Sequence, residues 1–195
     1  MRPVLFVMLI LTPALLLAQA ASIEEVGKSP VEAKFAGGGQ VRMDLCSGGI
    51  DLIGTDDGML RVDYDSKPEN DDVKVRLQVS GDQAGIKVTG CPHNNFRLTI
   101  DVPKSSNLYV RMFAGQLQVE GITGNKDLEL HAGQLTLDIG QAADYGHVDA
   151  SVLSGDLNAA PFGVSKGGLF RSFERTGAGK YRLHAHVGAG QVDLR

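Results

Sequence analysis

The sequence predicts an all-β protein, and specifically a single-stranded β-solenoid, or β-helix, with coils of about 20 residues. Three observations indicate this class. A strand–glycine–strand pattern recurs along the chain, helical periodicity is nearly absent, and the apolar residues are mostly small and aliphatic, with no Trp and only 6% aromatics. A twisted antiparallel β-sandwich is the alternative, because it also joins short alternating strands through glycine-rich turns.

In the recurring pattern, apolar or small residues stand at positions 0, 2, 4 and 6, a glycine at position 7, and apolar residues at positions 9 and 11. This alternation is typical of a strand with one buried and one solvated face. Because one such segment cannot bury its apolar face alone, we expect the segments to stack around a shared core. Five segments fit, although the third begins with Lys126: 41–52, 108–119, 126–137, 148–159 and 183–194.

The glycine reverses the parity of the pattern, from even positions before it to odd positions after it. A chain that keeps one face toward the core must therefore turn a corner or form a bulge at this residue. Glycine tolerates the backbone angles that such a corner requires. The predicted corner glycines are Gly48, Gly115, Gly133, Gly155 and Gly190.

A cleaved signal peptide is predicted over residues 1–20. Arg2 supplies a positive charge, an apolar run follows it, and Ala18 and Ala20 fit the small-residue cleavage rule. We therefore expect export to the periplasm, the cell surface or the extracellular space. After a lead-in at 21–36, residues 37–195 are expected to form one domain, with an irregular part at 55–104 and an insertion at 160–182.

Charge and cysteine content limit the partners and the compartment. The formal net charge of −4 argues against nucleic acid and anionic lipid as partners. After the signal peptide, no segment is long and apolar enough for stable membrane insertion. Cys46 and Cys91 are the only cysteines, and in an oxidising compartment they predict one disulfide.

Outward side chains form columns if the segments stack in register, and the columns at positions 8 and 10 are rich in amides. Stacked amides either stabilise a sheet as a ladder or present a flat polar face that hydrogen-bonds a glycan or another envelope polymer. The residues predicted to bind are Gln116, Gln118, Gln134, Thr136 and Asn158.

The insertion at 160–182 contributes further binding candidates, Phe170, Arg171 and Phe173, because arginines interleave there with aromatic residues. The insertion either caps one end of the stack, which protects an open strand edge, or forms a partner-binding loop. Both interpretations remain open from the sequence.

No catalytic residue, metal site or cofactor is predicted. His184 and His186 project from one side of a strand, but no third zinc ligand is evident. A Gly-x-Ser-x-Gly motif at 163–167 lacks the helix that a nucleophile elbow needs. The nearest approach to a catalytic cluster is the position-3 column, although cross-strand pairing explains its mixed charges more simply: Asp44, Arg111, Glu129, Ser151 and His186.

Two copies of Ala-Gly-Gln-Leu, which follow Phe113 and His131, and the ending 184–194 carry a family resemblance. Over most of residues 37–195 the chain resembles a bacterial family of exported "putative adhesin" domains of unknown function. The resemblance implies a β-solenoid-like, non-enzymatic domain in the envelope or on the cell surface, and it carries over no catalytic residues.

The sequence thus predicts a non-catalytic exported module, adhesin-like or an envelope scaffold, whose extended polar wall contacts a polymer or a protein partner. The alternative is a β-helix enzyme that acts on polysaccharide.

Overall fold

The computed structural model describes residues 23–65, 67–92 and 96–195, and the predicted signal peptide lies outside these residues. The regular structure in these ranges consists of strands and three short 3₁₀ turns, without any α-helix. The all-β prediction is confirmed. Within the same ranges, no helix has the length and apolar character needed to cross a membrane.

Eight short strands precede five long ones. The short strands are β1 (Ile23–Gly27), β2 (Val31–Lys34), β3 (Gln40–Leu45), β4 (Gly48–Thr55), β5 (Met59–Tyr64), β6 (Lys74–Ser80), β7 (Gln83–Thr89) and β8 (Arg97–Pro103). The long strands are β9 (Asn107–Glu120), β10 (Lys126–Leu137), β11 (Tyr145–Ala159), β12 (Val164–Thr176) and β13 (Tyr181–Leu194). The turns are η1 (Pro68–Asn70), η2 (Ala142–Asp144) and η3 (Ala160–Phe162).

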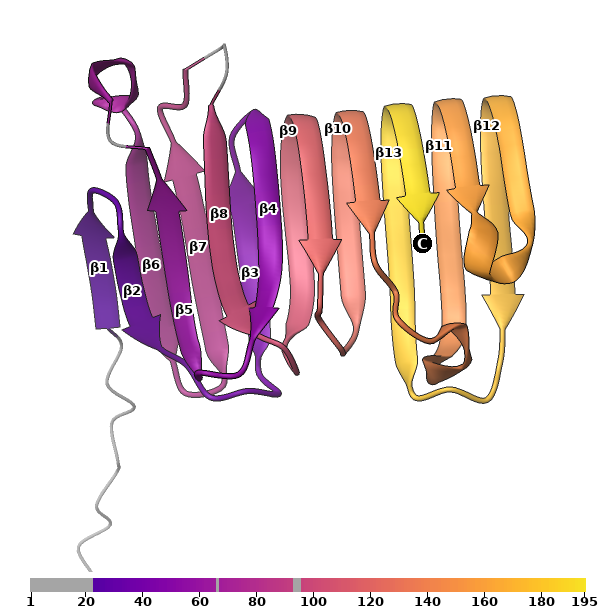
Figure 1. The fold of residues 1–195 in the computed structure, drawn as a ribbon, viewed down its shortest axis with the longest axis horizontal. Coiled ribbons are helices and arrows are strands. Elements are labelled where there is room, and N and C mark those ends of the chain that lie inside the picture. Colours follow the sequence, from indigo (N-terminus) through magenta and orange to yellow (C-terminus); the bar gives the residue numbers. More distant parts are fainter. Residues whose placement is uncertain (1–22, 66, 93–95) are drawn as a thin grey trace, which may run out of the picture.

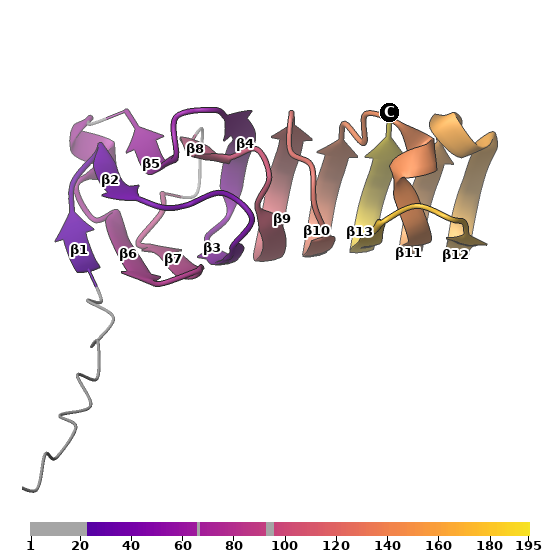
Figure 2. The same cartoon turned by 90° about the horizontal axis from the view of Figure 1, so that it is seen from below.

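These strands belong to one 13-stranded sheet that is folded over into two layers (Figures 1 and 2). The first layer begins with β1, β6, β7 and β3, and the second with β2, β5, β8 and β4. Both layers continue into the long strands, because β3 pairs with the first half of β9 and β4 with its second half. Each long strand crosses between the layers at its glycine, and we call this line of glycines the folded edge.

The five repeated segments pair parallel and in register, but not in sequence order. Along the folded edge Gly48 is followed by Gly115, Gly133, Gly190 and Gly155. The last segment, β13, therefore lies between β10 and β11, whereas a simple solenoid would add it at the end. Because β12 turns back antiparallel along the outer side of β11, the inner side of β11 is left to β13.

The reversal of parity at the glycine puts apolar side chains from both halves of a strand into the space between the layers. In β10, Leu128 and Leu130 before the glycine and Leu135 and Leu137 after it are all buried. Burial of one such aliphatic side chain stabilises a fold by about 1.5–3 kcal/mol, so the repeated pattern supplies the core.

The disulfide between Cys46 and Cys91 is present, as the sequence predicted, with a Cα–Cα distance of 6.0 Å. Cys46 lies between β3 and β4, and Cys91 follows β7, so the bond joins the folded edge to the chain just after β7. In the chain-entropy model, closing a loop with a sequence separation of 45 stabilises the folded state by about 4 kcal/mol.

Backbones approach closely at the folded edge, and this explains the glycine at position 7. Gly133 has a φ of 127°, and a Cβ built on it would lie 1.9 Å from the carbonyl oxygen of Gly115. Any side chain there would separate β10 from β9. The same contact recurs at Gly190, where a Cβ would lie 1.8 Å from the Gly133 oxygen.

Lys126, which interrupts the apolar pattern, faces the core and is only 2% exposed. Its Nζ donates to the Tyr145 hydroxyl at 2.7 Å and to the Gly124 carbonyl at 3.2 Å. Burial lowers the pKa of Lys126 to about 8, an effect that Asp138 partly offsets. Burial also raises the pKa of the Tyr145 phenol. Burial therefore favours the neutral amine of Lys126 and the neutral phenol of Tyr145 over their charged forms.

We expect Gly133→Ala to reduce the free energy of unfolding by about 3 kcal/mol or more, because the methyl group meets backbone atoms that cannot move independently. Gly85→Ala in β7 is the matched control, since a Cβ there meets nothing within 4 Å. Denaturant unfolding of both variants measures the difference. Equal stability of the two variants would contradict the proposed packing at the folded edge.

Lys126 predicts a pH-dependent stability. Between its folded pKa of about 8 and its unfolded value of 10.5, the unfolded chain binds the extra proton, so stability rises with pH. We expect a gain of about 1.6 kcal/mol between pH 8 and 9.5, where Tyr145, with an ordinary pKa of 10.0, is still mostly protonated in the unfolded chain.

The Lys126→Met variant should lack this gain, whereas Lys74→Met, at an exposed position of β6, should retain it. Denaturant unfolding at several pH values between 7 and 9.5 tests this. A gain of the same size in Lys126→Met would show that other groups cause it.

Candidate functional site

The outer face of the first layer carries charged and aromatic side chains in adjacent columns, and we call it the charged face. It is built from the first halves of the long strands and from β3 and β7, whose parallel register aligns equivalent positions. The position-3 column found in the sequence lies here, in the spatial order Asp44, Arg111, Glu129, His186 and Ser151.

Arg111 makes several contacts at the middle of the charged face. Its Nη1 lies 2.9 Å from Asp127 Oδ1, and its Nε lies 3.0 Å from Glu129 Oε2. Its guanidinium lies 3.7 Å from the centre of the Tyr109 ring, which the guanidinium of Arg42 also approaches, at 4.0 Å. These contacts orient a long side chain at the protein surface.

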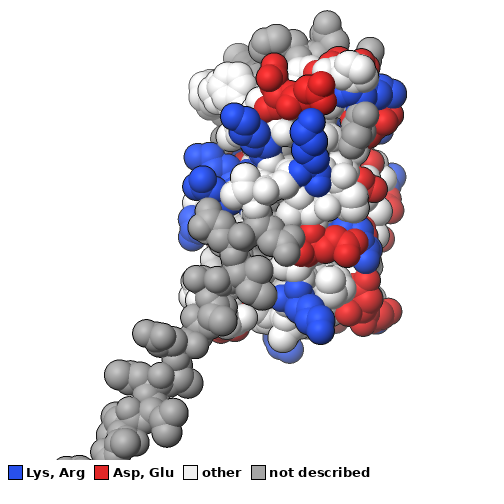
Figure 3. All heavy atoms as spheres, turned by 90° about the vertical axis from the view of Figure 1, so that its left-hand side faces the viewer, with Lys and Arg blue, Asp and Glu red and all other residues white. Residues whose placement is uncertain are grey.

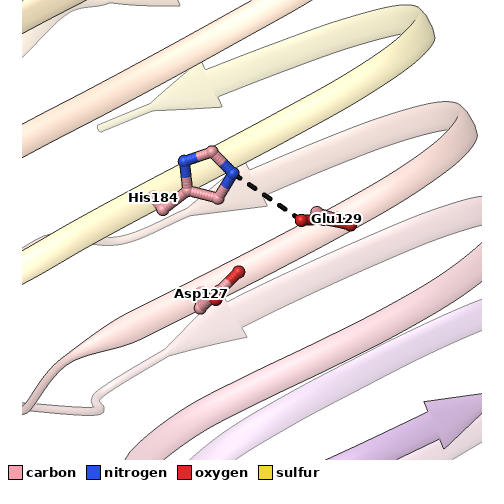
Figure 4. A group of neighbouring side chains, drawn as sticks. All are labelled: Asp127, Glu129 and His184. Carbon is pink, nitrogen blue, oxygen red and sulfur yellow. Dashed lines mark ion pairs between the residues drawn. The ribbon is translucent and has the colours of Figure 1, made fainter.

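Asp127, Glu129 and His184 form a cluster with ligand atoms within 4.8 Å of one another (Figure 4). An imidazole and two carboxylates could in principle hold a divalent cation. Arg111, however, already pairs with both carboxylates, and a cation would have to displace it. His184 Nδ1 also lies 3.2 Å from Asp149 Oδ2. The geometry therefore fits a cross-strand ion-pair network better than a metal centre.

The two histidines considered as a metal pair have separate partners. His184 lies between Glu129 and Asp149, at 3.8 Å and 3.2 Å. His186 shares a hydrogen bond of 2.9 Å with Ser151 through its Nδ1. Both histidines thus connect β13 to neighbouring strands.

A groove of about 670 Å³ lies on the charged face beside the disulfide. Its volume is within the range of small-molecule sites. Four members of the position-3 column line the groove: Asp44, Arg111, Glu129 and His186. Lys87 of β7, which is paired with Asp44 of β3, lines it as well. Cys46 and Gly90 border the groove on the disulfide side, and two rings lie at the folded edge.

These two rings belong to Phe113 and His131, at position 5 of adjacent strands. Their centres are 5.2 Å apart and their planes are within 13° of parallel, and Phe113 is 66% exposed. The next residue in the column is Gly188, where a Cβ would lie 2.4 Å from the His131 carbonyl oxygen. The stacked pair is therefore followed by a gap in the column.

The predicted binding residues Gln116, Gln118, Gln134, Thr136 and Asn158 lie on the outer face of the second layer, which we call the amide face. Several of their amides are already bonded within this face. Gln118 Nε2 donates to Glu120 at 2.7 Å, and Asn158 Nδ2 donates to Asp193 at 2.8 Å. Gln116 is exposed and lines a second hollow with Gly49.

Strand β12 forms one end of the sheet, and it carries the three binding candidates predicted in the insertion, Phe170, Arg171 and Phe173. Phe170 is 76% exposed at the folded edge, whereas the half-buried Phe173 packs against Phe162 at the end of the core, with ring centres 5.4 Å apart. Arg171 Nε donates to the Gly167 carbonyl at 2.7 Å. The three residues do not join those of the amide face in one site.

The two ends of the sheet differ in charge. On β12, Arg175, Arg171 and Lys166 pair with Val148, Val152 and Leu157, which face the core in β11. Charges at such positions discourage a further strand from extending the core. At the other end, near β1 and β2, positive and negative side chains are intermixed (Figure 3).

Three groove residues, Lys87, Phe113 and His131, were not among the binding residues predicted from the sequence. Lys87 lies in the irregular part, whose pairing with β3 no motif reveals. Phe113 and His131 could have been found from the pattern itself, since a bulky ring at an outward position beside the corner glycine has to be exposed.

Comparisons with known proteins show the fold alone. Neither a family model nor a curated protein matches the sequence. A solved structure, that of a "putative cell adhesion protein" from Clostridium sporogenes, is similar to this chain at a TM-score of 0.53 and 14% identity. The match covers 89% of this chain and 99% of that one, so the similarity in fold is not confined to one part of either chain.

Proposed function

We propose that the protein is an exported, non-catalytic binding module of the adhesin type. The similar fold of the "putative cell adhesion protein" supports this, and the disulfide supports an oxidising compartment outside the cytoplasm. The periplasm and the cell surface are both compatible with these observations. We further propose that the long strands are the coils of a β-solenoid whose last coil has been inserted between two earlier ones.

The observation that carries the proposal is the parallel, in-register pairing of the long strands. It repeats equivalent side chains at the spacing of neighbouring strands, about 4.8 Å, over several strands. Such an array offers many equal contacts along a line. A polymer with repeated units can occupy several of them at once, whereas a small substrate would use only one.

Weak contacts suffice for such a surface. One hydrogen bond contributes about 0.5–1.5 kcal/mol, and linked contacts raise the overall affinity through effective concentration. The amide face supplies donors and acceptors of this kind at the exposed Gln116 and at the half-buried Gln134 and Thr136, although Gln134 Nε2 also donates to the Thr136 hydroxyl at 3.5 Å. We propose an envelope or extracellular polymer as the partner, with a protein partner as the alternative.

The amide face can be tested by binding to insoluble polymers. We expect the protein to be retained on at least one of peptidoglycan sacculi, cellulose and chitin, and Gln116→Ala/Gln134→Ala to lower this retention about tenfold. Gln78→Ala/Gln83→Ala is the control, because it removes two exposed amides from β6 and β7. Sedimentation with each polymer measures binding.

If the unmodified protein is retained on none of the polymers, the proposed function is wrong. If the two double variants bind equally, the amide face is not the contact surface.

An enzyme acting on polysaccharide is the second candidate, because Asp44 and Glu129 both line the groove. They are two strands apart, about 10 Å between backbones, which approaches the carboxylate separation of inverting glycosidases. Arg111 lies on the strand between them and pairs with Glu129. A carboxylate bound in this way is a poor general acid, so we favour binding over turnover.

This second candidate has a direct test. We expect no release of reducing ends from soluble glycans by the unmodified protein, measured over a day at micromolar concentration. Turnover that disappears in both Asp44→Asn and Glu129→Gln would establish the enzyme and overturn the non-catalytic assignment.

A further inference from the structure

The groove on the charged face combines an exposed stacked ring pair with a polar floor. Phe113 and His131 are parallel to within 13°, and Phe113 remains 66% exposed although an aromatic ring gains most from burial. An apolar surface of this kind beside a groove can pack against a ligand that has an apolar face of its own.

The floor limits the charge of that ligand. Asp44 and Glu129 contribute two carboxylates, and Lys87 and Arg111 contribute two cations, so the charged side chains of the groove balance. A strongly anionic or cationic polymer would gain little there, because each attraction is accompanied by a repulsion. Hydroxyl groups, in contrast, both donate and accept, and they can use carboxylates and cations alike.

Part of the floor is fixed before a ligand arrives. Arg111 is held by Asp127, Glu129 and Tyr109, and His186 is held by Ser151. The disulfide fixes the opposite border of the groove at Cys46. Ordered groups lose little entropy on binding, which favours measurable affinity for a short ligand.

We propose that this groove binds a neutral saccharide segment, whose apolar ring face packs on Phe113 and His131 and whose hydroxyls bond to the charged floor. The proposal rests on the function proposed above and names the class of polymer that the module recognises. Gly188 belongs to the same site, since it lines the groove in the strand next to His131 and has no side chain that could cover the ring pair.

The test uses short, soluble probes: cellotetraose and chitotetraose as neutral ligands, and tetragalacturonate as an anionic one of equal length. Calorimetry and NMR titration of the full chain measure affinity and map the contacts. We expect a neutral tetramer to bind, to shift the amide signals of Phe113 and Gly188, and to exceed the affinity of the anionic tetramer.

Variants separate the ring contact from general effects on the fold. Phe113→Ala should weaken binding of the neutral tetramer at least tenfold, and Phe113→Tyr should restore it. Phe170→Ala is the matched control, because Phe170 is also exposed at the folded edge, on the terminal strand β12, and does not line the groove. The Phe170→Ala variant should bind the neutral tetramer with the same affinity as the unmodified protein.

Two results would overturn the proposal: equal affinity of Phe113→Ala and Phe170→Ala, or stronger binding of the anionic tetramer. The polymer assay distinguishes this failure from failure of the proposed function. If the protein is retained on polymers through the amide face but does not bind the tetramers in the groove, the proposed function stands and the proposed saccharide site is wrong. If the protein binds neither the polymers nor the tetramers, both proposals are wrong.

Discussion

Contact between backbones at the folded edge governs the arrangement of the other elements. At Gly133 and Gly190 the neighbouring carbonyl oxygen occupies the space where a side chain would begin. Because these strands are in contact at the bend, their halves are forced into register in both layers. The columns of the charged face and of the amide face are consequences of this constraint.

The same constraint links the core to the surface. The glycine reverses which side chains face inward, so the buried aliphatic residues alternate with outward columns on both layers. Lys126 is a local exception, and it is accommodated because Tyr145 and the Gly124 carbonyl satisfy its amine in the core. At the end of the sheet formed by β12, cationic side chains occupy the positions where the apolar core would otherwise continue.

The two outer faces offer different chemistry to a partner. The amide face is flat and partly self-bonded, as its hydrogen bonds to Glu120 and Asp193 indicate. The charged face has a groove with a fixed arginine and an exposed ring pair. They meet at the folded edge, where Phe113 on one side and Gln116 on the other are only a few residues apart.

Much of this was determined by the sequence itself. Period-two alternation with a parity change at glycine specified strands, the bend and the buried side of each strand, because these follow from local backbone geometry. The two cysteines specified the disulfide. The amide residues were placed on a common face for the same reason, since equivalent positions coincide once strands stack in register.

Only the tertiary structure decided the order of strands and the groove. The insertion of β13 between β10 and β11 depends on which side of β11 is taken by β12, and no residue pattern encodes that choice. Lys87 reaches the groove because β7 pairs with β3, although the two strands are far apart in the chain. Long-range pairing is set by the packing of the whole sheet, and it is therefore absent from any local pattern of residues.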